Sequence, residues 1–360
     1  MKRQKIGIVG AGALGCTIAS LLAIAGYDVE LAKIYKSQLA LPSQPAIEVN
    51  GEFGDHTAIV NTCKGIEKFS SLKDFIFIVP KAKDVKKCTS IALKYLSHSG
   101  KIVTLQNVLT IDDVLAVAPR EKVLGLILGW TTSRTSLFEY TVLSKGINII
   151  GSFCPNMERS ILELKDILSN ITDTYAYKNF IGIAISRLII NSCISSLGCI
   201  TGARLGNLMT LKNVKKLFEG LFREDMAVAK ARGIKIVPYC REFDYYKLME
   251  SGLVARINRR RKLDQLGTQN PYIVSSMLRN IENNKDTEIE YINGYFAKHG
   301  KLLNIDTPLN NRLMEMISDI ENHEIGIFPD NACDYYLRKP HKYREREDLY
   351  VNRRNQTSKY

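Results

Sequence analysis

Three glycines near the start of the chain constrain its fold more than any other feature. They lie in the run GAGALG, directly after a short apolar segment at Lys5 to Val9 and directly before an apolar helical segment at Cys16 to Ala25. In a strand–turn–helix unit, the first glycine permits a tight turn and the second lets the backbone approach a pyrophosphate. The third allows close packing of helix on strand. The N-terminus is therefore predicted to be a dinucleotide-binding βαβ unit whose loop is formed by Gly10, Ala11, Gly12, Ala13, Leu14 and Gly15.

The same segment also has the pattern of a secretion signal, with MKRQK before an apolar run. The glycine spacing and the strand at Val29 to Ala32 favour the dinucleotide-binding unit. The other long apolar stretch, Phe180 to Ile200, is interrupted by Arg187 and Asn191, so no membrane span is predicted. The eight cysteines are scattered, without a C-x-x-C pair beside histidines, and this favours free thiols in a cytoplasmic protein without a metal site.

Alternation of apolar runs with helical segments predicts the domain organisation. Phe75 to Val79 is a continuous apolar run, as expected for a strand buried on both faces of a parallel sheet, and Ile102 to Leu105 and Val123 to Leu128 repeat it. Tyr140 to Phe153 alternates like a strand or hairpin edge. We predict an α/β Rossmann-like, doubly wound domain over residues 1–178, an all-α domain over 179–326 with a central first helix, and a basic C-terminal tail over 327–360 that is peripheral or disordered.

The net charge of +13 favours acidic partners such as a phosphorylated cofactor or an anionic substrate. Basic residues concentrate in the tail and in RINRRRK at residues 256–262. Nothing around them resembles a nucleic-acid-binding fold, so solvated faces are the simpler interpretation and no nucleic-acid partner is expected.

The end of the second strand distinguishes NAD from NADP. An NAD site needs an acidic residue there to bind the ribose hydroxyls, but the strand ends Leu31-Ala32-Lys33, and Glu30 lies too early in the strand. A lysine at that position suits the 2′-phosphate of NADPH. We therefore predict NADP (NADPH) as the cofactor, with Lys33 binding its 2′-phosphate.

Two further polar residues follow buried strands, at the edge of the sheet where open α/β folds bind ligands. Lys81 follows FIFIVP and can reach a cofactor phosphate or the reacting centre. Asn107 follows IVTLQ and lies close to where a nicotinamide ring is expected. By position alone, each could equally be an ordinary loop residue.

Beyond these features the chain resembles the ketopantoate reductase family (2-dehydropantoate 2-reductases), NADPH enzymes that reduce an α-keto acid. The resemblance runs from residue 5 to about 322, without the basic insertion near 256–265 and the tail. It is carried by IGIVGAGALG, FIVPKAKDV, TLQN, GWTTSRT, SRLIINSCISSLGCITG and VSSMLRNIENNKDTEIEYINGY. It implies that Glu288 contacts cofactor or substrate hydroxyls, that Ser276 and Asn191 bind the substrate, and that Asn107 and Lys81 lie at the cofactor. Without the resemblance, Glu288 would be an exposed helix residue and Ser276 a packing serine. Asn191 stands out by itself, because an amide inside IINSCIS must find polar partners.

The departures from the family pattern fall on the substrate side. Arg187 stands where the family has its proton-donating lysine, four residues before Asn191 on the same helical face. Ser195 replaces a second asparagine, and we expect it to bind the substrate in its place. Leu205 replaces a third asparagine, and Val108 replaces the glycine after Asn107. A guanidinium stays protonated to above pH ~12, so Arg187 can polarise a carbonyl or clamp a carboxylate but is a poor general acid.

Three hypotheses follow. The first is an NADPH-dependent reductase of this family that acts on an α-keto acid or related carbonyl substrate, with Arg187 and Glu288 as catalytic residues. The second is a true 2-dehydropantoate 2-reductase of the pantothenate pathway that tolerates the arginine. The third is a non-catalytic NADP-binding protein whose basic segments serve a partner. For the first two, the partner is a small-molecule carboxylate, and the resemblance leaves a homodimer through the helical domain open.

Overall fold

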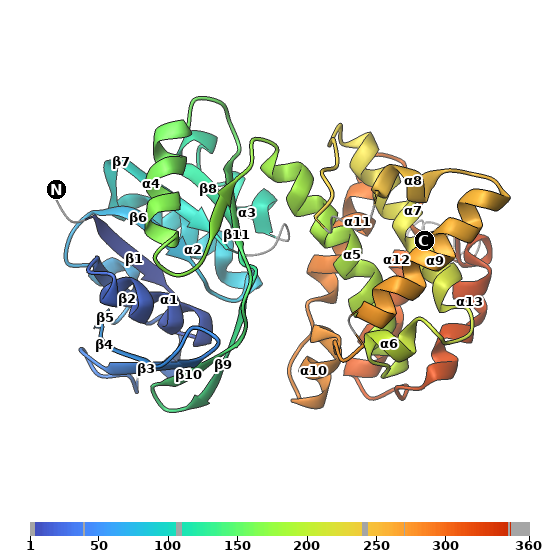
Figure 1. The fold of residues 1–360 in the computed structure, drawn as a ribbon, viewed down its shortest axis with the longest axis horizontal. Coiled ribbons are helices and arrows are strands. Elements are labelled where there is room, and N and C mark those ends of the chain that lie inside the picture. Colours follow the sequence, from blue (N-terminus) through green and yellow to red (C-terminus); the bar gives the residue numbers. More distant parts are fainter. Residues whose placement is uncertain are drawn as a thin grey trace, which may run out of the picture. The chain divides into compact units, whose positions relative to one another are not determined.

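The structure is a computed structural model of the chain that describes residues 4–38, 40–105, 110–239, 244–269, 271–344 and 346. It divides into two compact units, one up to Phe180 and one from Ile181 onward. Figure 1 shows strands and helices in the first unit and helices in the second. The predicted fold class, an α/β Rossmann-like domain followed by an all-helical domain, is confirmed.

The main sheet of the first unit has eight strands in the order β12-β11-β8-β7-β6-β1-β2-β5. The six strands from β8 to β5 run parallel to one another, and β11 and β12, which are parallel to each other, run in the opposite direction. The expected buried strand is β6, and its residues from Phe75 to Ile78 are at most 2% exposed. The strand bounds are β1 Lys5–Val9, β2 Asp28–Ala32, β5 Asn61–Cys63, β6 Lys73–Ile78, β7 Leu96–Thr104, β8 Val123–Ile127, β11 Asn148–Ser152 and β12 Thr174–Ala176.

A second, four-stranded sheet was not foreseen from the sequence. Its order is β4-β3-β10-β9, with bounds β3 Ala46–Gly51, β4 His56–Ile59, β9 Thr131–Ser136 and β10 Glu139–Ser144. The segment expected as one strand or hairpin edge, Tyr140 to Phe153, is therefore divided between two sheets, with β10 in the small sheet and β11 in the main sheet. An alternating pattern shows that one strand face is buried but does not show which sheet buries it.

The small sheet explains why α1, Ala13–Ile24, is apolar on all sides. Every residue from Gly15 to Leu22 is buried, because α1 contacts strands of the main sheet and all four strands of the small sheet (Figure 1). Hydrogen bonds tie it to the small sheet: Ser20 Oγ donates to the Ile47 carbonyl at 3.2 Å, and the Thr17 and Thr132 hydroxyls lie 3.0 Å apart. The run that resembles a secretion signal is thus a helix packed between two sheets.

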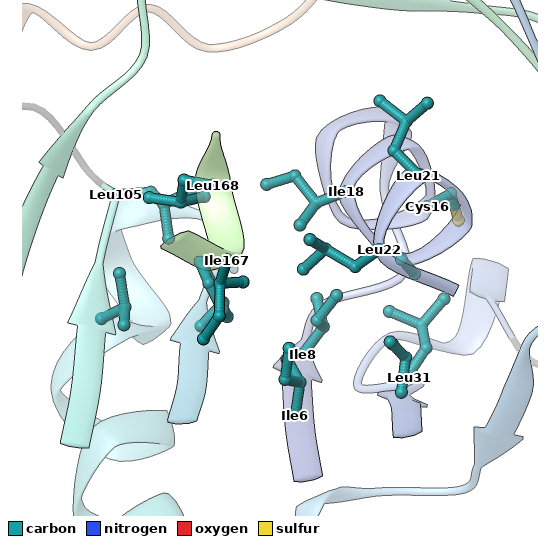
Figure 2. Packing of buried hydrophobic residues seen from close by; sticks show 14 of the residues in the cluster. Ile6, Ile8, Cys16, Ile18, Leu21, Leu22, Leu31, Leu105, Ile167 and Leu168 are labelled. Atoms are coloured by element: carbon teal, nitrogen blue, oxygen red, sulfur yellow. The ribbon is translucent and has the colours of Figure 1, made fainter. Parts of the chain in front are cut away.

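The core of the first unit joins α1 to the sheet and to α4, Glu158–Leu168. In Figure 2, Ile18 and Leu22 of α1 lie above Ile6 and Ile8 of β1, and Ile167 and Leu168 of α4 approach the same cluster. Two other helices of this unit, α2 Val85–Ala92 and α3 Ile111–Leu115, contact each other, and α2 also packs on β6 and β7. This packing holds β1 and the start of α1, between which the glycine loop lies.

The second unit contains no strand among its described residues and is built around α5, Phe180–Thr201. This helix is long and apolar enough to cross a membrane by composition, but 78% of its apolar window is buried inside the unit, as expected of a central core helix. The other helices are α6 Leu205–Leu208, α7 Val214–Ala231, α8 Tyr245–Met249, α9 Leu253–Gln269, α10 Ser276–Glu282, α11 Ile289–Leu302, α12 Pro308–Glu321 and α13 Tyr335–Arg338.

Two adjacent carboxyl groups of α7 are buried in the second unit. Glu224 accepts hydrogen bonds from the backbone N–H groups of Leu309 (2.9 Å) and Asn310 (3.1 Å), and so stabilises the start of α12. The side-chain amide of Asn310 donates to Glu224 and to Asp225, both at 2.9 Å, and Ser192 of α5 donates to Asp225. Burial raises the pKa of Glu224 to about 7 and raises the pKa of Asp225 well above its ordinary value.

These carboxyl groups predict that the second unit loses stability as the pH rises. Between the ordinary carboxyl pKa and about 7, folded Glu224 keeps a proton that the unfolded chain releases, so raising the pH favours unfolding. The free energy of unfolding should fall by roughly 1–3 kcal/mol between about pH 5 and pH 8, and urea titrations at several pH values would measure it. In Glu224→Gln the slope should be smaller. An equal or steeper slope in that variant would contradict the assignment.

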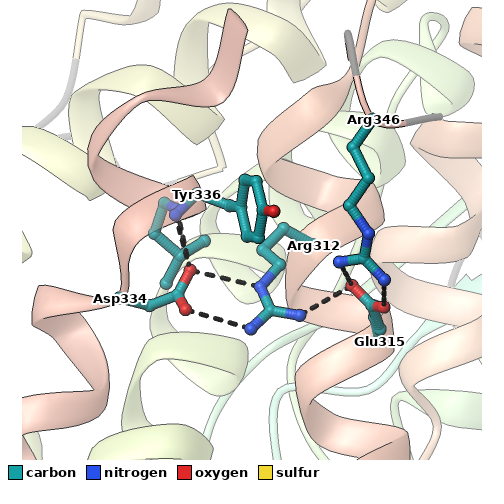
Figure 3. Close-up of polar contacts among 6 residues, drawn as sticks. Arg312, Glu315, Asp334, Tyr336 and Arg346 are labelled. Carbon is teal, nitrogen blue, oxygen red and sulfur yellow. Dashed lines mark hydrogen bonds and ion pairs between the residues drawn. The ribbon is translucent and has the colours of Figure 1, made fainter. Parts of the chain in front are cut away.

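Ionic and cation–π contacts hold the segment after α12, which carries part of the predicted C-terminal tail. Asp334, at the start of α13, accepts two hydrogen bonds from Arg312 of α12, at 3.1 and 3.0 Å. Arg312 also donates to Glu315 (2.6 Å), which in turn pairs with Arg346 (2.8 Å), as Figure 3 shows. Both guanidinium groups lie over the Tyr336 ring. As far as residue 346, the described part of this segment is therefore attached to α12.

Candidate active site

The three loop glycines meet three different steric demands. Gly10 has a φ of +111°, and a Cβ there would lie 2.8 Å from the Val79 carbonyl oxygen. A Cβ on Gly15 would lie 1.9 Å from the Gly10 carbonyl oxygen, so only glycine allows α1 to begin this close to the turn. A Cβ on Gly12 would meet no protein atom within 4 Å. The space beside Gly12 is therefore open, as it must be where a phosphate approaches the backbone.

The start of α1 suits an anion. Gly12 occupies the N-cap position, no side chain caps the helix there, and its first turn has no acidic residue. The first backbone N–H groups of a helix have no partner within the helix, and the helix dipole adds partial positive charge to them. With the open space at Gly12, these groups fit the pyrophosphate of a dinucleotide. Ala11 lies in the turn between β1 and α1, and Ala13 and Leu14 are the first two residues of α1.

At the end of β2, the structure does not support the expected role of Lys33. Its side chain is only 5% exposed, and its ammonium group donates to the Leu41 carbonyl oxygen at 2.8 Å. Lys33 thus holds the loop after β2, and its ammonium group is bonded within the protein. The sequence shows a cation at this position, but it does not show that a nearby carbonyl takes up the ammonium group.

Glu30 is also unavailable to a ribose, as its early position in β2 suggested. It forms a buried ion pair with Lys73 at 2.7 Å and accepts hydrogen bonds from the backbone and hydroxyl of Ser70, both at 2.9 Å. Burial alone would raise the pKa of Glu30, but the hydrogen bonds from Lys73 and Ser70 hold it below its ordinary value. This carboxylate is therefore ionised and fully occupied by the fold.

Lys81 lies at the carboxyl edge of the sheet, as predicted, with an exposed side chain directly before the short 3-10 turn Ala82–Asp84. Its backbone N–H donates to the Tyr35 hydroxyl at 2.9 Å, and that hydroxyl donates to Asp84 at 2.7 Å. Tyr35, which the sequence did not single out, thus joins the loop after β2 to the loop after β6. The predicted cofactor residue Asn107 lies outside the described residues.

In the second unit, Arg187 and Asn191 share one face of α5. From Gly182 to Ile200 that helix is buried except at Arg187, Asn191 and Ile194, which are partly exposed at helical spacing. A residue four positions along a helix lies over the same face, so the two polar side chains are neighbours. An otherwise buried helix therefore presents a guanidinium and an amide at its one accessible stripe.

Ser195 orients Asn191 in this structure. The Ser195 hydroxyl donates to the Asn191 side-chain oxygen at 2.6 Å, which leaves the amide NH₂ as the donor for another group. Ser195 is itself only 4% exposed. This supports a role for Ser195 beside the predicted substrate residue, through the amide, and does not support the direct substrate contact expected from the sequence.

Arg187 has an aromatic neighbour that the sequence did not indicate. Its guanidinium lies over the Tyr239 ring, 5.2 Å from the ring centre. The Tyr239 backbone N–H donates to Ser186 Oγ at 2.8 Å, and Tyr245 of α8 donates to the Ser186 carbonyl at 2.9 Å. These bonds fix the aromatic ring beside Arg187. Only tertiary structure brings residues 187 and 239 together, so no local pattern could reveal the pair.

The two serines at the start of α10 have different roles. Ser275 is the buried N-cap: its hydroxyl accepts from the Leu278 N–H at 3.3 Å and donates to the Ser195 carbonyl at 2.7 Å, joining α10 to α5. Ser276, the predicted substrate residue, follows it with an exposed side chain. The N-cap preference for serine could have identified Ser275 as the structural member of the pair.

Glu288 lies at the N-cap position of α11 without capping it. Burial raises the pKa of its carboxyl group, and no hydrogen bond to that group is found among the residues that the structure describes. A partly buried carboxyl group of this kind can still bind a hydroxyl of a ligand. Both predicted catalytic residues, Arg187 and Glu288, therefore belong to the helical unit.

Comparison with known proteins identifies the family of the chain. Two models of one family match: "Ketopantoate reductase PanE/ApbA" at residues 6–154 and "Ketopantoate reductase PanE/ApbA C terminal" at residues 179–321. A curated relative, the 2-dehydropantoate 2-reductase of Archaeoglobus fulgidus, is 25% identical over 89% of this chain and 99% of its own length.

Solved structures show the same fold. A ketopantoate reductase from Ralstonia eutropha JMP134 superposes with a TM-score of 0.71 at 21% identity, over 89% of this chain and 99% of that one. A ternary complex of D-mandelate dehydrogenase with NADH and anilino(oxo)acetate gives 0.73 at 18% identity and the same coverage. With the two family models matched in order over residues 6–154 and 179–321, the chain belongs to the ketopantoate reductase family.

Proposed function

We propose that the protein is an NADPH-dependent reductase of an α-keto acid, in which the helical unit binds the substrate through Arg187 and Asn191. The observation that carries the proposal is the single accessible stripe of α5, where these two donors stand side by side on a buried helix. A guanidinium and an amide NH₂ are both suited to the oxygens of a carboxylate or a carbonyl. The glycine loop supports the cofactor half of the proposal, because its open space and helix N-terminus fit a dinucleotide pyrophosphate.

Arg187 would act electrostatically. NADPH, when bound, would supply the hydride. The carbonyl oxygen of the substrate would then gain negative charge and take its proton from water. A permanently charged guanidinium stabilises that oxygen or holds the neighbouring carboxylate, but it does not release a proton at neutral pH. The Tyr239 ring beneath the guanidinium and the Ser195 hydroxyl on Asn191 keep both donors in position.

Glu288 is proposed to bind a hydroxyl group of the substrate or cofactor. Its carboxyl group lies within the helical unit without a partner among the described residues, and burial raises its pKa. A carboxyl group with a raised pKa accepts a hydrogen bond when ionised and donates one when protonated. Glu288 can therefore hydrogen-bond to a ligand oxygen both when that oxygen donates a hydrogen bond and when it accepts one.

The second candidate function is a reductase whose specific substrate is ketopantoate. The curated relatives that match almost their whole length are 2-dehydropantoate 2-reductases, and this favours the same substrate here. The D-mandelate dehydrogenase complex favours the wider class, because its ligand is also an oxo acid. The arginine in place of the family lysine favours the wider class as well. The free thiols of all the described cysteines suit the reducing cytosol, where we propose that the protein acts.

The proposal predicts NADPH oxidation that depends on an α-keto acid. Purified protein should consume NADPH, measured by its absorbance, with at least one member of a panel containing ketopantoate and α-keto acids of different side-chain size. A matched series of aldehydes and ketones without a carboxylate should react at least about 10-fold more slowly, because a charge-assisted hydrogen bond contributes about 1.5–3 kcal/mol. Binding of NADPH without turnover of any substrate would instead favour a non-catalytic protein.

A further inference from the structure

A small cavity of about 120 Å³ adjoins the glycine loop in the first unit. It begins at Ala11 and Gly12 and continues to the loop after β2 and to the β9–β10 hairpin. The remaining lining residues are Ser37, Gln38, Ala40, Leu41, Arg134, Leu137 and Tyr140. None of these is acidic, and Arg134 gives the lining its one positive charge.

The Arg134 guanidinium is available to an anion. Its side chain is exposed on β9, and its Nε donates to the Ser136 carbonyl oxygen at 3.1 Å. Across the described residues, no carboxylate forms an ion pair with it. The terminal nitrogens of the guanidinium can therefore form the paired hydrogen bonds that phosphate and carboxylate groups accept.

The loop after β2 contributes further donors. The side-chain oxygen of Gln38 accepts hydrogen bonds from the backbone N–H groups of Ile34 (2.9 Å) and Tyr35 (3.3 Å). Because the oxygen is used inside the loop, the NH₂ of Gln38 remains as its donor for a ligand. Ser37 adds a hydroxyl to the same lining.

The cavity lies in the region where this fold distinguishes NADP from NAD. It shares Gly12 with the predicted pyrophosphate site, and its far side is the loop that follows β2, the strand whose end contacts the adenine ribose in this fold. A ribose with free hydroxyls needs a carboxylate there, but Glu30 is held by Lys73 and Ser70. The lysine at the end of β2 is held by Leu41.

From these contacts we propose that the cavity binds the 2′-phosphate of NADP(H), with Arg134 as its principal cation and Gln38 and Ser37 as supporting donors. The inference rests on the proposed function, since it assumes that the glycine loop binds a dinucleotide. It assigns cofactor selection to the small sheet, because β9 belongs to that sheet and carries the arginine. Lys33, which occupies the expected sequence position, then has only a structural role.

The test measures nucleotide binding directly, by calorimetry with NADPH, NADH and 2′,5′-ADP. In Arg134→Ala, the Kd for NADPH and for 2′,5′-ADP should rise by about 10- to 100-fold, as expected for loss of a charge-assisted hydrogen bond, while the Kd for NADH changes less than about 2-fold. Arg134→Lys should recover part of the loss. Lys36→Ala is the matched control, because it removes an exposed cation from the loop after β2 without altering the cavity lining.

Several outcomes would overturn the inference. Equal weakening of NADPH and NADH in Arg134→Ala would contradict a 2′-phosphate contact, and so would an unchanged preference. A loss of NADPH binding in Lys33→Met, at an unchanged melting temperature, would return the role to Lys33. Failure of the wild-type protein to bind either dinucleotide would contradict the proposed function together with this inference. Loss of NADPH affinity in the Arg134 variants alone supports the 2′-phosphate contact. The substrate panel then tests the reductase activity separately.

Discussion

Alanine at Gly12 is expected to weaken dinucleotide binding strongly while the first unit stays folded. The added Cβ meets no protein atom within 4 Å, and the backbone at Gly12, with φ −87° and ψ −174°, suits alanine without strain. The methyl group would instead occupy the space where a phosphate approaches. Overpacking of this kind costs roughly 1–3 kcal/mol, so Kd for NADPH and NADH should both rise about 5- to 150-fold.

Gly15→Ala is the matched control, because the same methyl group at that position meets the protein. Its Cβ would lie 1.9 Å from the Gly10 carbonyl oxygen, so α1 would have to move away from the turn. This variant should lower the melting temperature or fail to fold, whereas Gly12→Ala should melt within a few degrees of the wild type. Unchanged nucleotide binding by a folded Gly12→Ala variant would contradict the placement of the pyrophosphate.

Removal of the Arg187 side chain should reduce catalysis with little effect on cofactor affinity. Loss of one group that stabilises a developing oxyanion costs about 10²–10³ in rate, so kcat/KM of Arg187→Ala for its best α-keto acid should fall by that factor. The Kd for NADPH should stay within about 2-fold of wild type. Steady-state kinetics and calorimetry on the same preparation would separate the two effects.

Arg187→Lys tests what the arginine changes. A lysine can lose its proton, so this variant should acquire a fall in kcat at alkaline pH that the wild type lacks. If ketopantoate turnover rises strongly in this variant, the wild-type site is shaped for another keto acid. Tyr239→Phe keeps the aromatic ring and should behave nearly like wild type. If neither Arg187 variant alters turnover, Arg187 lies outside the site.

Much of the fold could be predicted because central strands of the main sheet are buried on both faces, and because Gly10, Gly12 and Gly15 have the spacing of a dinucleotide-binding loop. Continuous apolar runs such as the one in β6 identify strands without reference to their neighbours, and a buried helix such as α5 is mostly apolar. The small sheet escaped prediction because its strands are half-exposed. Strands β3 and β10 pair in parallel although they are far apart in the chain.

The candidate site could be predicted only in part, and for a related reason. Residue types at fixed helical spacing, such as Arg187 and Asn191, can be found in the sequence. The contacts that decide the role of a side chain involve residues from other parts of the chain. The Leu41 carbonyl accepts a hydrogen bond from Lys33, and the Tyr239 ring lies beneath Arg187. Ser275 donates to the Ser195 carbonyl. In the segment after α12, contacts between arginines, acids and tyrosines replace an apolar stripe. Hydrophobic periodicity therefore fails there, although the described residues of this segment are attached to α12.

The two-sided burial of α1 has a consequence for synthesis of the chain. A ribosome releases α1 early, but β9 and β10, which complete the sheet on one side of it, end only at Ser144. At about 5–20 residues per second, this delay lasts on the order of 6–24 s. During that time an apolar helix with a basic segment before it is incompletely covered. The nascent chain therefore exposes, for several seconds, apolar surface of the kind that molecular chaperones bind.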